Sequence, residues 1–238
     1  MSMFAYAGII LGIMVAVYLL TKLLTPSTEL SMLAAAVAGA LAGGFWIPPR
    51  HIAEGAVTYL DINLIFITAT LFMAILKESG GVAFVVRAIL RRFHKNRALL
   101  LVLLSVLLLV PGAFTGAGSV TVLITGGMVA TVLHYLGISK QKTSAIVFII
   151  AGMSAAAPPV SLWAMLTAAG VNMPYVGFFF PLLVPCLIVS LITIFLLGWR
   201  GTEMDLTRVL ENLPEPPEKM SWFRVLLPFL ILLTLIFV

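Results

Sequence analysis

Two long stretches without a charged side chain limit most strongly what this chain can fold into. No Asp, Glu, Lys or Arg occurs between Arg97 and Lys140, or between Lys142 and Arg200. A soluble domain carries charge on about a quarter of its residues because its surface must be wetted. Here only 10% of the 238 residues are charged and 62% are hydrophobic. The sequence therefore predicts an all-α polytopic membrane protein.

The apolar runs and the polar segments between them give an expected order of elements. A bilayer core about 30 Å thick needs roughly 20 apolar residues of helix. We expect two N-terminal transmembrane helices in 1–50, a transmembrane helix with an amphipathic helix in 51–97, a hairpin in 98–139, a broken transmembrane helix in 140–174, a further transmembrane helix in 175–200, a polar loop in 201–222, and the start of another apolar segment in 223–238.

The segment 98–139 contains two apolar arms separated by the run PGAFTGAGS at 111–119. As a helix, the first arm, 98–110, would be only about 20 Å long, which is too short to cross the bilayer core. The run between the arms has no charge and no Trp or Tyr to hold it at an interface. We therefore predict a re-entrant hairpin whose tip lies inside the membrane, where bare backbone must be buried in protein or line a wet cavity.

The run 143–173 has the opposite irregularity, because as one helix it would be about 45 Å long. Pro158 and Pro159 lie near its middle. Proline lacks an N–H donor and pushes the residue before it out of the helical region. The sequence therefore predicts two half-helices separated at the proline pair.

The distribution of basic residues predicts the orientation of the chain. The face with the excess of Lys and Arg lies in the cytoplasm. If the hairpin returns to its own side, Arg50 alone of the 14 Lys and Arg residues lies on the opposite face. The N-terminus is then outside. The basic helix at 82–95 would lie on the cytoplasmic surface, where we expect its stripe of Arg87, Arg91 and Lys95 to contact anionic lipid headgroups rather than nucleic acid.

Two broken segments in succession would bring free backbone groups together near the bilayer midplane. Half-helix N-termini favour anions, and unwound carbonyls coordinate Na⁺, as in secondary transporters. Nearby hydroxyls could bind the same ions, and they belong to Thr115, Ser119, Thr121, Ser154 and Ser161. In the alternative interpretation these small and hydroxyl residues pack helices closely, and the chain is a non-transporting scaffold or channel-like component.

The runs LFMAILKESGG (71–81), FTGAGS (114–119) and SAAAPPV (154–160), with a basic helix after the first, resemble the large membrane subunit of tripartite ATP-independent periplasmic (TRAP) transporters. That family belongs to the ion transporter superfamily. The resemblance covers the chain as the N-terminal half, one repeat of an inverted-repeat protein. It implies Na⁺-coupled uptake of an organic anion, most simply a carboxylate, by an elevator-type mechanism in a bacterial or archaeal cytoplasmic membrane.

The resemblance also implies partners and site residues. The partners are a small membrane subunit, a periplasmic substrate-binding protein and a missing C-terminal half, so we expect the chain to be a fragment or, less simply, a split half. Na⁺ is the coupling ion, with no organic cofactor. Carried over by position, the ion-binding residues are Thr115, Gly116, Gly118, Ser119, Gly152 and Ala157, and the substrate-binding residues are Thr115, Ser119, Ser154, Pro158, Pro159 and Ser161.

Sequence patterns for other functions are not found. There is no H-E-x-x-H and no G-x-S-x-G, so the chain is not expected to be a metalloprotease or a serine hydrolase. His51, His94 and His134 are isolated and are interpreted as interfacial residues, without a transition-metal site. The single cysteine, Cys186, excludes a disulfide within the chain. We therefore expect a protein that is not an enzyme.

Overall fold

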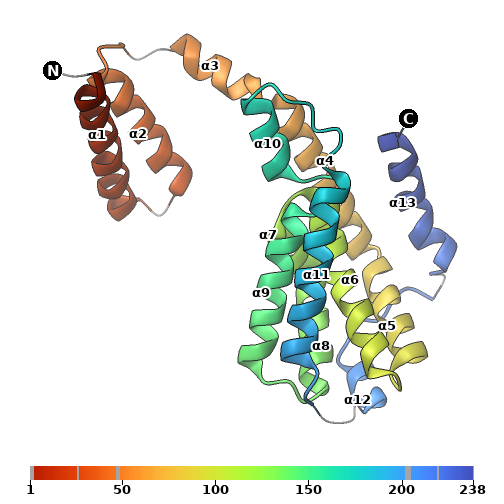
Figure 1. Ribbon diagram of the computed structural model, residues 1–238. Coiled ribbons are helices and arrows are strands. Elements are labelled where there is room, and N and C mark those ends of the chain that lie inside the picture. Colours follow the sequence, from red (N-terminus) through yellow and green to blue (C-terminus); the bar gives the residue numbers. More distant parts are fainter. Residues whose placement is uncertain (1–2, 26, 47–48, 202–204, 219, 238) are drawn as a thin grey trace. The chain divides into compact units, whose positions relative to one another are not determined.

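The computed structural model describes residues 3–25, 27–46, 49–201, 205–218 and 220–237, which form two compact units, Met1–Leu60 and Asp61–Val238. Every regular element in these ranges is a helix, so the all-α prediction is confirmed (Figure 1). Five of the described helices are long and apolar enough to cross a bilayer: Phe4–Leu24, Leu60–Glu78, Arg97–Thr115, Gly118–Tyr135 and Phe179–Gly198. The chain is therefore an α-helical multi-pass membrane protein.

The first unit is a helix pair followed by a short helix. α1 (Met3–Leu24) packs along α2 (Thr28–Ala42), whose N-terminus is capped by the Ser27 hydroxyl. The buried residues of α2 are small and four positions apart, Ser31, Ala35 and Gly39, which lets the two helices approach closely. The short helix α3 (Pro49–Thr58), which was not predicted from the sequence, begins with a proline, a residue favoured in the first turn of a helix.

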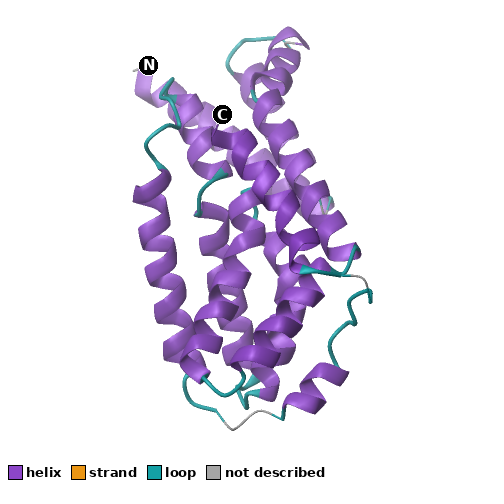
Figure 2. Cartoon of the chain, turned by 90° about the vertical axis from the view of Figure 1, so that its right-hand side faces the viewer, coloured by secondary structure: helices purple, strands orange, loops and turns teal. Residues whose placement is uncertain are grey.

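The second unit holds the remaining elements. In chain order they are α4 (Leu60–Glu78, which begins at the last residue of the first unit), α5 (Gly81–Phe93), α6 (Arg97–Thr115), α7 (Gly118–Thr121), the π-helical turn η1 (Val122–Gly126), α8 (Gly127–Tyr135), α9 (Lys140–Ala156), α10 (Leu162–Gly170), α11 (Phe179–Gly198), α12 (Leu206–Glu211) and α13 (Trp222–Phe237). Helices α6, α8, α9 and α11 run along roughly one axis (Figures 1 and 2).

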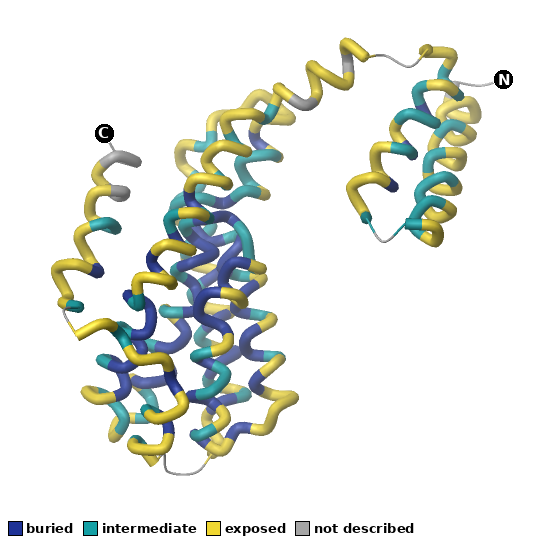
Figure 3. The backbone as a smooth tube through the Cα atoms, turned by 180° about the vertical axis from the view of Figure 1, so that it is seen from behind, coloured by how far each residue is buried: buried dark blue, intermediate teal, exposed yellow. Residues whose placement is uncertain are grey.

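The core of this unit is formed where α6 packs against α9, α11 and the α7–η1 part of the second arm, and where α8 packs against α9. Leu100, Leu104 and Leu108 of α6 recur at helical spacing and are fully buried, as are Ile146 and Ile150 of α9. Figure 3 shows the buried positions concentrated in the middle of the unit, with exposed positions on its outer surface. This core holds the hairpin and the first half of the broken helix in fixed register.

The first hairpin arm is longer than predicted. Its helix continues through Pro111 and ends at Thr115 rather than at Val110, so it has 19 residues and a length of about 28 Å. Proline within a membrane helix is tolerated where the surrounding protein packs around it, and Pro111 is buried inside α6. The first arm is therefore long enough to cross the bilayer core, and the prediction that it is too short was wrong.

A different observation shows that the chain returns to the end from which it left. The start of α6 and the residue after α8 meet at one place, because a Cβ built on Gly201 would touch both the Arg97 guanidinium and the Leu136 carbonyl. The Arg97 guanidinium also donates to the Gly198 carbonyl at the end of α11, over 2.8 Å. Arms α6 and α7–η1–α8 are therefore antiparallel, and they reverse at Gly116, which has a φ of +69°.

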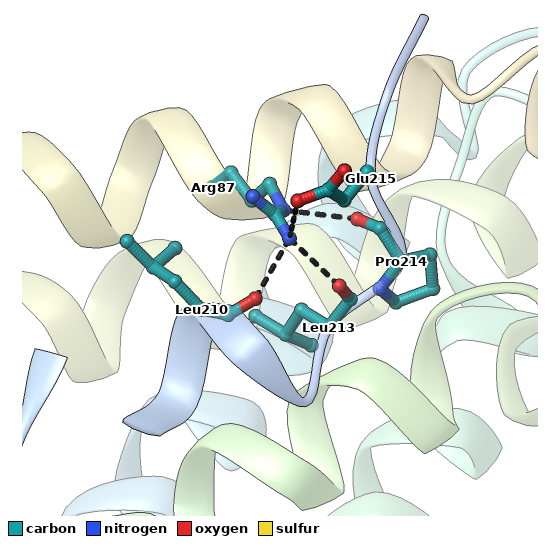
Figure 4. Close-up of polar contacts among 5 residues, drawn as sticks. All are labelled: Arg87, Leu210, Leu213, Pro214 and Glu215. Atoms are coloured by element: carbon teal, nitrogen blue, oxygen red, sulfur yellow. Dashed lines mark hydrogen bonds and ion pairs between the residues drawn. The ribbon is translucent and has the colours of Figure 1, made fainter. Parts of the chain in front are cut away.

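Helix α5 corrects a second expectation, because much of it is buried in protein. Seven of its residues are buried, including Arg87, which is 9% exposed. The Arg87 guanidinium donates to the carbonyls of Leu210, Leu213 and Pro214 over 2.7, 2.8 and 2.9 Å (Figure 4). Arg87 is therefore not available to lipid headgroups, whereas Arg91 and Lys95 of the same stripe are exposed. The periodicity correctly placed Arg87, Arg91 and Lys95 on one stripe of the helix. It did not predict that Arg87 contacts the end of α12 and the loop after it.

Candidate functional site

The hairpin tip lies against the interruption between α9 and α10. The Val160 N–H donates to the Ala113 carbonyl over 2.9 Å, which joins the interruption directly to the end of α6. Helix α9 ends at Ala156 and α10 begins at Leu162, where the proline pair predicts a break. We call this contact, residues 112–121 with residues 151–162, the tip–break contact.

Glycines let the two backbones approach. A Cβ on Gly116 would lie 2.7 Å from both the N and the Cβ atom of Leu162, and one on Gly118 would collide with the Ala151 carbonyl. A Cβ on Gly112 would collide with the Ser154 side chain. Gly112 was missed by the sequence reasoning, although it forms a G-x-x-x-G pattern with Gly116, a known signal for close helix packing in membranes.

Two buried hydroxyls cross the contact. The Thr121 and Ser154 hydroxyl oxygens are 2.8 Å apart, and both residues are fully buried. Ser154 donates to the Ala151 carbonyl over 2.7 Å, so Thr121 donates to Ser154. The Thr115 hydroxyl is similarly occupied as a donor, but the oxygens of all three keep acceptor capacity. A cation can therefore use these oxygens, whereas an anion finds their hydrogens already bonded.

The prolines release backbone acceptors at the end of α9. In an uninterrupted helix the N–H groups of residues 158 and 159 would bond to the carbonyls of Ser154 and Ala155. Pro158 and Pro159 have no N–H, so these two carbonyls lose their partners within the helix. Such carbonyls are typical ligands of Na⁺ in interrupted membrane helices.

The N-terminus of α10 is held by Ser161 and Tyr175. The Ser161 hydroxyl accepts from the Ala164 N–H over 3.4 Å, and the Ser161 N–H donates to the Tyr175 hydroxyl over 3.3 Å. Burial raises the pKa of Tyr175 and outweighs the opposing effect of this hydrogen bond. The phenol therefore stays protonated at neutral pH and can donate to a ligand. Tyr175 and Ser161 are 14 residues apart in the sequence, and no sequence pattern indicated this contact.

A cleft of about 690 Å³ opens beside the break. It lies between α4, the hairpin tip at Phe114, the break at Pro159 and Val160, and the loop containing Tyr175. Its size suits a small organic ligand, but most of its lining is apolar, and Thr68 and Tyr175 contribute the hydroxyl groups.

Apart from Ser161, which caps α10, the predicted site residues divide into three groups. Thr115, Gly116, Gly118 and Ser154 are brought together at the tip–break contact. Pro159 lines the cleft, while Pro158 and Ala157 are buried, Ala157 packing near Ala113 and Cys186. Ser119 is exposed, and nothing lies within 4 Å of a Cβ built on Gly152.

The contact carries no formal charge, because no Asp, Glu, Lys or Arg occurs in either run that forms it. Within the described ranges, no cluster of three or more His, Cys, Asp and Glu could hold a metal ion. An ion bound here would therefore be held by carbonyl and hydroxyl oxygens, a donor set that suits a hard monovalent cation rather than a transition metal.

Comparison of the chain with models of protein families, with curated proteins and with solved structures finds no match.

Proposed function

We propose that this chain is a subunit of a secondary active transporter of the TRAP type, which couples Na⁺ to the uptake of an organic anion. The observation that carries the proposal is the tip–break contact, where a hairpin tip and an interrupted helix share a hydrogen bond between Val160 and Ala113. Paired discontinuous segments of this kind are how secondary transporters build ion sites without buried charge. The hairpin is then re-entrant, and the subunit lies in a bacterial or archaeal cytoplasmic membrane with its N-terminus outside.

In this proposal Na⁺ binds on the oxygens of the tip and the break. The carbonyls of Ser154 and Ala155, freed by the prolines, and the hydroxyl oxygens of Thr115 and Ser154 have acceptor capacity. By the family resemblance, further backbone groups complete the ion site. They belong to Gly116, Gly118, Ser119, Gly152 and Ala157.

The bound cation supplies the positive charge that the protein lacks at this place. A carboxylate beside Na⁺ in a site of low dielectric is attracted far more strongly than in water. The N-terminus of α10 at Ser161, the Tyr175 hydroxyl and the exposed Ser119 would orient it. Pro158 and Pro159 keep this end of the helix open. We also propose that the chain works together with a small membrane subunit, a periplasmic binding protein and a second repeat.

The test is calorimetric titration of the full-length protein with a panel of mono- and dicarboxylates, in Na⁺ and in choline. We expect binding in Na⁺ and at least about tenfold weaker binding in choline, which equals about 1.4 kcal/mol. Linkage requires that substrate raise Na⁺ affinity by the same factor. Ser154→Ala should reduce the Na⁺ effect, whereas Ser105→Ala, an equally buried serine of α6 outside the contact, should not.

The alternative is a scaffold in which the broken segments serve packing. It is favoured by the hydroxyls of Thr115, Thr121 and Ser154, which are fully buried and hydrogen-bonded within the protein. Equal affinity for every carboxylate in Na⁺ and choline, or no binding in either, would support this scaffold function over transport.

A further inference from the structure

The cleft of about 690 Å³ beside the break offers little to a ligand that carries several charges. None of the described residues that line it is Lys, Arg, His, Asn or Gln. Aliphatic and aromatic side chains supply most of the lining, among them Ile65, Met165 and Phe179. A charged group placed against such a surface loses its hydration without gaining a partner. Most of the cleft therefore suits an apolar portion of a ligand.

In the described lining, only Tyr175 has a side-chain hydroxyl hydrogen that a ligand can use. The Thr68 hydroxyl donates to the Leu64 carbonyl over 2.7 Å, so its hydrogen is occupied. The Tyr175 hydroxyl accepts from the Ser161 N–H over 3.3 Å, and no described residue accepts its hydrogen. Ser161 belongs to the tip–break contact. The cleft can therefore bind one anionic group, at the end next to that contact.

Phe114, at the hairpin tip, lies between this cleft and a second one. The second cleft has a volume of about 320 Å³, lies between α13 and helices α4, α5 and α6, and is lined mostly by apolar side chains. Phe114 lines both clefts, and its ring centroid is 5.3 Å from that of Phe229 in α13. Removing the Phe114 ring would therefore extend the first cleft toward the second.

We propose that the cleft takes the apolar body of a monocarboxylate, and that Phe114 limits the length of that body. This inference rests on the proposed function, in which Na⁺ at the tip–break contact attracts a carboxylate, and it names the class of anion. The Tyr175 hydroxyl donates to the carboxylate, and the apolar chain extends along the cleft toward Phe114. A second carboxylate on the same chain would lie among apolar side chains without a donor, so dicarboxylates of equal length are disfavoured.

The experiment titrates the full-length protein in phosphatidylcholine nanodiscs by calorimetry, in Na⁺ and in choline, with empty nanodiscs as the reference for partition into lipid. The ligands are the linear monocarboxylates from butanoate to decanoate and the dicarboxylates of equal carbon number. In Na⁺, each added methylene should tighten monocarboxylate binding about fourfold until the chain reaches the end of the cleft. Each dicarboxylate should bind at least about tenfold more weakly than the matching monocarboxylate.

Two variants test the two ends of the ligand separately. Phe114→Ala should leave the affinity for short acids unchanged and move the length limit to longer acids. Tyr175→Phe should weaken the binding of every acid by the same factor, about tenfold, because one hydrogen bond to a charged group is lost. The matched control is Phe72→Ala. Phe72 is also half-buried and its ring centroid is 5.5 Å from that of Phe229, but it lines neither cleft.

The outcomes separate this inference from the function on which it rests. If dicarboxylates bind in a Na⁺-dependent way as tightly as monocarboxylates, or if affinity does not depend on chain length, the inference is overturned and Na⁺-coupled transport still stands. A length limit that Phe114→Ala and Phe72→Ala leave equally in place overturns the role of Phe114. No Na⁺-dependent binding of any acid overturns both proposals. The comparison of acids on the native protein needs no variant, so it decides the ligand class even if Phe114→Ala does not fold.

Discussion

At the scale of single residues, glycines decide how closely the hairpin tip can approach the broken helix. Gly112 faces the Ser154 side chain with no room for a Cβ, whereas a Cβ on Gly152 of α9 meets nothing within 4 Å. The two glycines therefore have different roles although both belong to the same region. Gly112 is needed for close packing at the tip–break contact, whereas nothing packed against Gly152 requires a glycine there.

We predict that Gly112→Ala destabilises the protein and Gly152→Ala does not. Forcing an extra methyl group into a packed contact costs about 1–3 kcal/mol, because Ser154 and Thr121 must move. Alanine at position 152 replaces an exposed glycine within a helix and should be neutral or slightly stabilising. Thermal unfolding of both variants in one detergent measures the difference. Equal melting temperatures would show that the tip and the break are not in contact.

Arg87 is the other residue whose role depends on distant groups. Its guanidinium satisfies three carbonyls at and after the C-terminus of α12, where a helix leaves its last carbonyls unpaired. Glu215 is 3.7 Å away, but its side chain is 87% exposed, so the ion pair adds little. The carbonyls are therefore the important partners.

We predict that Arg87→Gln loosens the segment 206–215 from α5. The loss of charge-assisted hydrogen bonds to three carbonyls should cost on the order of 2 kcal/mol. Hydrogen–deuterium exchange of this segment should accelerate, while exchange in α9 stays unchanged. Arg91→Gln removes the same charge from an exposed position of α5 and is the control. Identical exchange in the two variants would contradict the role assigned to Arg87.

At the scale of elements, the break between α9 and α10 depends on the proline pair. Alanines at 158 and 159 would restore N–H donors for the carbonyls of Ser154 and Ala155 and allow α9 to extend. The hydrogen bond from Val160 to Ala113 fixes the position of the break against the hairpin and would be lost as α9 extends.

We predict that the double change Pro158→Ala, Pro159→Ala reduces Na⁺-dependent transport by at least about tenfold, or about 1.4 kcal/mol of ion binding. Membrane insertion should be unaffected because the variant has higher helix propensity. Uptake into proteoliposomes, normalised to inserted protein, measures this effect. Pro185→Ala, which removes a proline inside α11, should transport normally. Normal transport by the double variant would leave the prolines a role in packing alone.

At the scale of the whole molecule, the antiparallel arms of the hairpin determine which residues share a side of the membrane. The start of α6 and the end of α8 meet beside Gly201. Gln141 should therefore lie on the same side as Arg97, and Met173 at the far end of the broken helix on the other.

We predict that Ser119→Cys, in a Cys186→Ala background, is labelled by a membrane-impermeant reagent only from the side that labels Gln141→Cys. Ser119 is exposed at the hairpin tip, and in a re-entrant hairpin an aqueous path from that side would reach it. Met173→Cys, also exposed, should be labelled from the opposite side. Strong labelling of position 119 from the Met173 side in every condition would reject a re-entrant hairpin.

The sequence alone determined that the chain is an all-helical membrane protein, and it located the interruption at Pro158 and Pro159. Both conclusions depend on local chemistry, because long uncharged runs cannot be wetted and proline lacks a donor wherever it occurs. The motifs also identified Thr115, Gly116, Gly118 and Ser154 before their contacts were known. The role of these residues in binding remains a prediction.

The tertiary structure decided which groups satisfy one another. The sequence did not reveal that α6 continues through Pro111, because the surrounding helices bury a proline that would otherwise be expected to end the helix. Nor did it pair Thr121 with Ser154, Tyr175 with Ser161, or Arg87 with carbonyls more than a hundred residues away. The periodicity of a helix sequence predicts which face of the helix a side chain lies on, but the hydrogen-bond partner of that side chain belongs to another segment. Only the packing of the helices brings the two together.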